Sequence, residues 1–175
     1  MLERLQITRF KSIRDADISL GRVNLFIGAN GVGKSNILEV IGIASAMLGR
    51  GINSTDLEKK GIRSTPPELM KSAHKNKDLP KTLQIEANIT PNICYKCNLS
   101  SGANDISLKV HSESMIFRGE KIFGRSGRGN NVKNSSVSGI LDKNRGFWDQ
   151  IKAAFSFDDT FTSTISEFSR YTIYS

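Results

Sequence analysis

The chain has 175 residues, of which 38% are hydrophobic, and a formal net charge of +8 from 25 basic and 17 acidic side chains. This length and composition favour one globular domain with long polar loops over a disordered chain. No apolar run approaches the ~20 residues of a membrane span, and the charged N-terminus is unlike a signal peptide, so the sequence indicates a cytoplasmic protein without a membrane partner. A basic surface is compatible with nucleic acid as a partner.

The N-terminal residues alternate between apolar and polar side chains on both sides of a short turn at 11–15. Leu5, Ile7 and Phe10 precede the turn, and Ile18 and Leu20 follow it. This pattern predicts two antiparallel strands. They lead into the apolar run Val23–Ile27, which is expected to form a third strand.

The stretch Gly28–Ser35 reads GANGVGKS and fits the phosphate-loop pattern G-x-x-x-x-G-K-[ST] without a mismatch. An ordinary glycine turn is the alternative, but a preceding strand and a following helix are the context that a phosphate loop requires. Backbone N–H groups and the helix dipole would hold the phosphates of ATP, Lys34 would reach the β- and γ-phosphates, and Ser35 would ligate Mg²⁺. The expected nucleotide contacts are Gly28, Asn30, Gly31, Gly33, Lys34, Ser35 and Asn36.

From Lys34 to Leu48 apolar residues cover most of a helix circumference, so this helix is expected to be buried on more than one side. Glu39 and Asn36 are expected on its surface or behind the direct contacts. The polar region 51–81 predicts a short helix at Thr55–Lys60, capped by Ser54 or Thr55, and otherwise loop. Arg63 is interpreted as solvated, with a phosphate or partner contact as the alternative.

Alternating runs separated by Asn, Gly and Ser predict an antiparallel meander of about four strands between 82 and 123. Cys94 and Cys97 lie in one of these runs, three residues apart and so on opposite faces. This favours reduced structural cysteines over a half zinc site or a redox pair.

The glycine- and serine-rich stretch Gly124–Ser138 is expected to be a mobile loop. Gly146–Phe155 predicts a helix whose aromatic residues enter the core, and Phe168–Tyr174 alternates like a strand. The densest basic stretch, Arg118–Lys133, is interpreted as a solvated loop, with a patch contacting a nucleic-acid backbone as the alternative.

Leu5–Arg14 (LQITRFKSIR) followed by Ile27–Glu39 (IGANGVGKSNILE) resembles the N-terminus of an ABC-type ATPase head. The resemblance is to the RecF/SMC group, which includes the overcoming-lysogenization-defect ATPases and related predicted ATPases of bacterial defence operons. It is clear over Met1–Leu48. It implies that Lys11 and Ser12, with Arg14 as a further candidate, approach the base and sugar of the nucleotide. A polar hairpin turn is the alternative.

The resemblance implies an α/β fold, the N-terminal lobe of a P-loop NTPase (ABC ATPase head) with an antiparallel β subdomain. The expected divisions are a strand–loop–helix core at 1–50, a polar insertion at 51–81, the β subdomain at 82–123, a flexible loop at 124–138, and a helix and strand that return to an incomplete head at 139–175.

Hydrolysis in this family also needs an apolar strand that ends in Asp-Glu, and a Ser-Gly-rich signature. Asp158-Asp159 follows a segment that is too short and polar to be that strand, and no signature is present in the sequence. We therefore expect these residues to bind nucleotide and to hydrolyse it poorly, the intact protein being the ATPase. No catalytic residue is assigned.

Two functional hypotheses follow. The first is an ATP-gated homodimer or higher oligomer that controls an effector or nuclease, in DNA metabolism or anti-phage defence. The second is a truncated, non-catalytic nucleotide-sensing scaffold that binds a partner or nucleic acid through a basic surface. A transport ATPase is less favoured because the Phe-Lys-Ser turn and the Gly-x-Asn-Gly loop point elsewhere.

Overall fold

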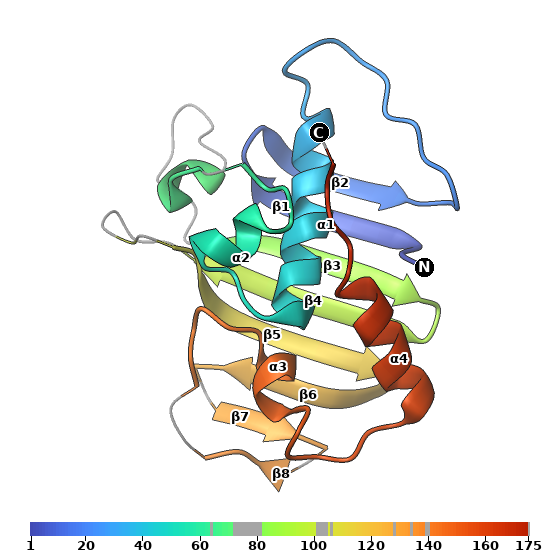
Figure 1. The fold of residues 1–175 in the computed structure, drawn as a ribbon, viewed down its shortest axis with the longest axis vertical. Coiled ribbons are helices and arrows are strands. Elements are labelled where there is room, and N and C mark those ends of the chain that lie inside the picture. Colours follow the sequence, from blue (N-terminus) through green and yellow to red (C-terminus); the bar gives the residue numbers. More distant parts are fainter. Residues whose placement is uncertain are drawn as a thin grey trace.

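The computed structural model describes residues 1–63, 65–71, 82–100, 105, 107–127, 129–133, 135–138 and 141–174. Their strands form one antiparallel eight-stranded sheet in the order β2-β1-β3-β4-β5-β6-β7-β8 (Figure 1). The strands are β1 (Arg4–Phe10), β2 (Ile13–Ser19), β3 (Thr82–Thr90), β4 (Ile93–Ser100), β5 (Lys109–Phe117), β6 (Glu120–Ser126), β7 (Gly129–Val132) and β8 (Ser135–Ser136).

The helices lie on one face of this sheet, and α1 runs across its middle (Figure 1). They are α1 (Lys34–Gly49), α2 (Ser54–Glu58), the 3₁₀ helix η1 (Pro67–Met70), α3 (Phe147–Ile151) and α4 (Asp159–Phe168). Among the helices of the described ranges, none has the length and apolar character that crossing a bilayer demands.

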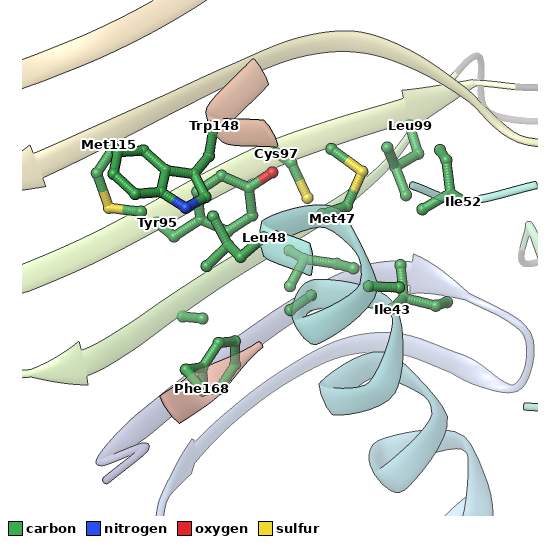
Figure 2. Packing of buried hydrophobic residues seen from close by; sticks show 14 of the residues in the cluster. Ile43, Met47, Leu48, Ile52, Tyr95, Cys97, Leu99, Met115, Trp148 and Phe168 are labelled. Atoms are coloured by element: carbon green, nitrogen blue, oxygen red, sulfur yellow. The ribbon is translucent and has the colours of Figure 1, made fainter. Parts of the chain in front are cut away.

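The apolar face of the sheet follows from the alternation of its strands. In β4, Tyr95, Cys97 and Leu99 are buried, whereas Lys96 between them is exposed. A two-residue period places such side chains on opposite faces, which leaves one face for the core and one for solvent. Figure 2 shows Met47 and Leu48 of α1 close to this buried face.

Several predicted elements are confirmed. The N-terminal strand pair is β1 and β2, the meander is β3 to β6, and the helix after the glycine loop is α1. β1 also pairs with β3, from Arg4 opposite Asn88 to Thr8 opposite Gln84. The N-terminal pair and the meander therefore share one sheet.

The expected strand at Val23–Ile27 is wrong for this structure. The segment has no regular secondary structure, and the exposed fractions of Val23, Leu25 and Ile27 are 90%, 81% and 84%. A strand needs a neighbour for its backbone N–H and C=O groups. No described strand pairs with this segment, and the described partner of β2 is β1. The alternation of side chains could not reveal this missing neighbour.

The expected loop at Gly124–Ser138 is also wrong where the structure describes it, since β7 pairs with β6 and β8 pairs with β7. Phe123 and Val132 face each other across β6 and β7, and both are fully buried. Residues 128 and 134 lie outside the described ranges. Gly124, Gly129 and Ser135 therefore lie within short strands here rather than in one continuous loop.

The expected strand at Phe168–Tyr174 is replaced by the end of α4 and an irregular segment. Phe161, Ile165 and Phe168 are buried at helical spacing. The Asp158 side chain caps the helix by accepting a hydrogen bond from the Phe161 N–H at 3.0 Å. The helix period thus extends to Phe168.

Two helices have other boundaries than expected. α2 begins at Ser54 and is capped by Asn53, whose side chain accepts a hydrogen bond from the Asp56 N–H. α3 ends at Ile151, short of the predicted Phe155. Phe147 and Trp148 enter the core, as their spacing predicts. Of the loop expected around α2 in the region 51–81, residues 64 and 72–81 lie outside the described ranges.

A buried ion pair fastens the segment before α3 to the sheet. Arg125 of β6 lies 2.7 Å from Glu113 of β5, and it donates hydrogen bonds to the carbonyls of Asp142 and Arg145. Glu113 also accepts hydrogen bonds from the Tyr95 hydroxyl and the Phe147 N–H, at 2.6 and 2.7 Å. Burial raises the pKa of the Glu113 carboxyl, and the positive charge of Arg125 opposes that rise.

We predict that Arg125→Met lowers the free energy of unfolding by about 3–5 kcal/mol, because it leaves the Glu113 carboxyl buried without its cation. Urea denaturation measures the loss. Arg118→Met is the matched control: its guanidinium is largely exposed and lies 3.8 Å from Asp158, so the change should cost less than about 1 kcal/mol. Equal losses for the two variants would contradict this role of the buried pair.

Candidate phosphate-binding site

The glycine loop adopts backbone conformations that only glycine enters readily. Gly31 has φ of 86° and Gly33 has φ of 102°, both in the left-handed region. Nothing lies within 4 Å of the position where a Cβ would stand on Gly31. The loop is therefore open at the point where a ligand would approach its backbone.

Helix α1 begins directly after this loop. Its N-cap residue is Gly33, no side chain caps it, and its first turn contains no acidic residue. The N–H groups of the first turn and the positive end of the helix dipole are thus available to an anion.

Lys34 folds back over the loop. Its Nζ atom donates hydrogen bonds to the carbonyl oxygens of Gly28 and Ala29, both at 2.7 Å. These contacts hold an ammonium group against the loop. A phosphate oxygen could replace the two carbonyls as its acceptor.

A half-open cavity of about 450 Å³ adjoins the loop, and both Lys34 and Ser35 line it. Arg22 and Phe26 line it as well, together with Tyr171 from the segment after α4. The start of α1 therefore borders a space that can admit a ligand larger than a single phosphate.

Arg22 is a lining residue that the sequence pattern does not identify, because the pattern indicates only a tight turn there. The turn is held by the Asn24 side chain, which accepts a hydrogen bond from the Gly21 N–H and donates one to the Gly21 carbonyl. An asparagine three residues after a glycine is the local signal for this arrangement. The cation at Arg22 adds positive charge to the cavity wall.

The β1–β2 turn brings two predicted residues to the start of α1. The Asn36 side chain donates a hydrogen bond to the Ser12 hydroxyl at 2.8 Å, and a Cβ on Gly33 would lie 2.9 Å from that same hydroxyl oxygen. Lys11 lies beside Ser12 and pairs with Glu39 at 2.5 Å. The structure thus brings Ser12 and Asn36 together beside the loop, and it joins Lys11 to the same helix through Glu39.

Two other residues considered from the sequence, Glu39 and Arg14, have side chains that make no hydrogen bond or ion pair with the glycine loop in the described ranges. Glu39 is buried, with an exposed fraction of 5%, which rules out the surface alternative and leaves the expected place behind the direct contacts. Arg14 points to solvent with its side chain 80% exposed, 3.7 Å from Asp15. A contact of Arg14 with a nucleotide stays a prediction.

Among the described residues, the site offers a magnesium ion few protein ligands. It therefore suits a nucleotide whose phosphates supply most of the ligands of that ion. Ser35 is exposed at the first turn of α1 and offers one hydroxyl. Mg²⁺ commonly keeps several waters and binds few protein groups beside the phosphates. In the described part of the chain no cluster of three metal-binding side chains occurs. Asp158 and Asp159 lie at the beginning of α4, away from the start of α1 (Figure 1).

The cysteine pair lies on opposite faces of β4, as expected. Cys97 is buried, whereas Cys94 is half-buried and donates a hydrogen bond to Glu86 on the polar face. Burial raises the pKa of the Cys94 thiol to about 11. Both are free thiols, and their opposite directions prevent them from holding one ion together.

The basic stretch Arg118–Lys133 does not form one solvated loop. Arg125 is buried against Glu113, and the Lys133 ammonium donates to the Ser156 carbonyl. Arg118 lies over the Phe117 ring at 4.7 Å. Internal contacts therefore engage three of the cations that a nucleic-acid patch would need.

The chain is similar to one family of ATPase domains over most of its length and to two RecF proteins over a shorter stretch. The family model described as AAA ATPase domain matches residues 1–168. The DNA replication and repair protein RecF of Renibacterium salmoninarum is 45% identical over 47 residues, which are 26% of this chain and 12% of that protein. The RecF protein of Paenarthrobacter aurescens is 39% identical over 56 residues, 31% of this chain and 14% of that protein. The matches thus span only a small part of the length of these relatives.

A solved structure described as "Structural biochemistry of ATP-driven dimerization and DNA stimulated activation of SMC ATPases" aligns with a TM-score of 0.45 and 20% identity. The alignment covers 69% of this chain and 70% of that one.

We predict that Gly33→Ala destabilises the chain more than Gly119→Ala. Both glycines have positive φ, which costs an alanine roughly 1–2 kcal/mol, but only at Gly33 does the new Cβ meet a neighbour, Ser12. The difference in the free energy of unfolding, measured in urea, should be at least about 1 kcal/mol. A larger loss for Gly119→Ala would contradict the contact between the turn and the loop.

Proposed function

Because this chain belongs to the AAA ATPase domain family over residues 1–168, we propose that it binds ATP with Mg²⁺ at Gly28–Ser35. The family match and the RecF relatives confirm the resemblance to a RecF/SMC-type P-loop ATPase, and with it the α/β fold class. The observation that carries the proposal is the open glycine loop in front of an uncapped helix, with Lys34 held against it.

In this proposal the phosphates take the place of the loop carbonyls at Lys34. The ammonium then contacts the β- and γ-phosphates, while backbone N–H groups of Asn30 to Gly33 and the start of α1 surround the phosphate chain. Mg²⁺, bound with the nucleotide, neutralises phosphate charge, and the Ser35 hydroxyl is its proposed protein ligand. Lys11 and Ser12 are proposed to face the sugar and base.

The proposed cellular role is that of an ATPase whose heads dimerise around ATP and so control a partner or effector. DNA metabolism is the favoured setting because the relatives are described as DNA replication and repair proteins. Anti-phage defence rests on family analogy alone. The nucleotide-sensing scaffold is less favoured, because internal contacts engage cations of the basic stretch on which its surface would depend.

We predict that Lys34→Met weakens MgATP binding by roughly 10- to 150-fold, since charge-assisted hydrogen bonds to the phosphates are lost. Isothermal titration calorimetry of the full chain measures the change. Lys59→Met removes an exposed lysine at the end of α2 and should leave the affinity unchanged. Binding that survives Lys34→Met at full strength would contradict the proposed site.

A further inference from the structure

The β1–β2 turn is held in place by contacts of both the backbone and the side chain of Lys11. Its backbone is fixed by the Lys11 N–H, which donates to the Met70 carbonyl at 2.9 Å, and Lys11 adopts a left-handed conformation with φ of 47°. A non-glycine residue enters this region only where surrounding contacts stabilise it. The contacts of its side chain add to that stabilisation.

The Lys11 ammonium is paired with a buried carboxylate. Its Nζ atom lies 2.5 Å from Glu39 and 3.2 Å from the Thr65 hydroxyl. The side chains of Lys11 and Glu39 are only 16% and 7% exposed. A buried pair of this kind adds little net stability, but here it fixes the relative position of the two elements that carry it.

Glu39 also has a fixed relation to the phosphate loop. It follows Ser35 by four residues in α1, so the two side chains share one face of the helix, about one turn apart. The carboxylate thereby connects the turn to the helix just behind the proposed phosphate site.

A second contact lies at the loop itself. Ser12 accepts the hydrogen bond from Asn36, and its hydroxyl oxygen lies only 2.9 Å from the position that a Cβ on Gly33 would take. Movement of the turn would therefore change the space beside Gly33 and the first turn of α1.

We infer that Glu39 is a positioning residue for the nucleotide site: through Lys11 it holds Ser12 against Gly33 and Asn36. This inference rests on the proposed function, because it concerns the affinity of that same site. Glu39 acts through the turn and makes no contact with the phosphates.

The test combines Glu39→Gln, Lys11→Met and the double variant in the full chain. Two quantities are measured: the MgATP dissociation constant, and the amide NMR resonance of Gly33 without nucleotide. We expect each single variant to shift the Gly33 resonance, Glu39→Gln to weaken binding about tenfold and Lys11→Met at least as much, with no loss in the double variant beyond that of Lys11→Met alone. Glu58→Gln, at an exposed glutamate of α2, is the control and should change neither quantity.

Asn36→Ala is a second test variant. It removes the hydrogen bond to the Ser12 hydroxyl and leaves the ion pair of Lys11 and Glu39 intact. It should also shift the Gly33 resonance. A merely structural role would lower the melting temperature while the folded fraction kept its affinity, and that result would overturn the inference. So would additive losses in the double variant.

Failure of the proposed function is a separate outcome. If the unmodified chain binds no MgATP, the proposed function fails. The Gly33 resonance of the variants then still decides whether Glu39, through Lys11, holds Ser12 against Gly33. If Lys34→Met abolishes binding while Glu39→Gln changes neither quantity, the proposed function stands and the inference is overturned.

Discussion

The arrangement depends on the burial of α1 against the apolar face of the sheet. Ile43, Met47 and Leu48 are buried there (Figure 2), and this packing fixes the direction of the helix. Because the glycine loop is joined directly to the first turn of this helix, the direction of α1 determines where the loop N–H groups point. The ion pair of Lys11 and Glu39 then fixes the neighbouring turn to the same helix.

Much of this could be predicted from local pattern. Alternation identifies β1 to β6, and the helical period identifies α1, because each signal reflects burial on one face. The loop motif identifies Lys34 and Ser35. The errors arise where the outcome depends on a distant partner: Val23–Ile27 has the side chains of a strand but no described strand beside it.

The internal partners of the charged residues do not follow from residue type alone. The sequence leaves open whether Glu39 lies on the helix surface or behind the direct contacts, because its cation, Lys11, lies 28 positions away in sequence. Composition likewise assigns Arg125 to a solvated basic stretch, although Glu113 receives it in the core. Long-range charge pairing has no local period, so only the fold reveals it.

The most direct test of the central claim is amide hydrogen exchange of the full chain with and without millimolar MgATP. The account predicts slower exchange for the amides from Asn30 to Asn36, where phosphates would accept their hydrogen bonds, and unchanged exchange in β3 and β4. Unchanged exchange in the loop at these concentrations, or protection confined to the sheet, would contradict the assignment of this loop as the nucleotide site.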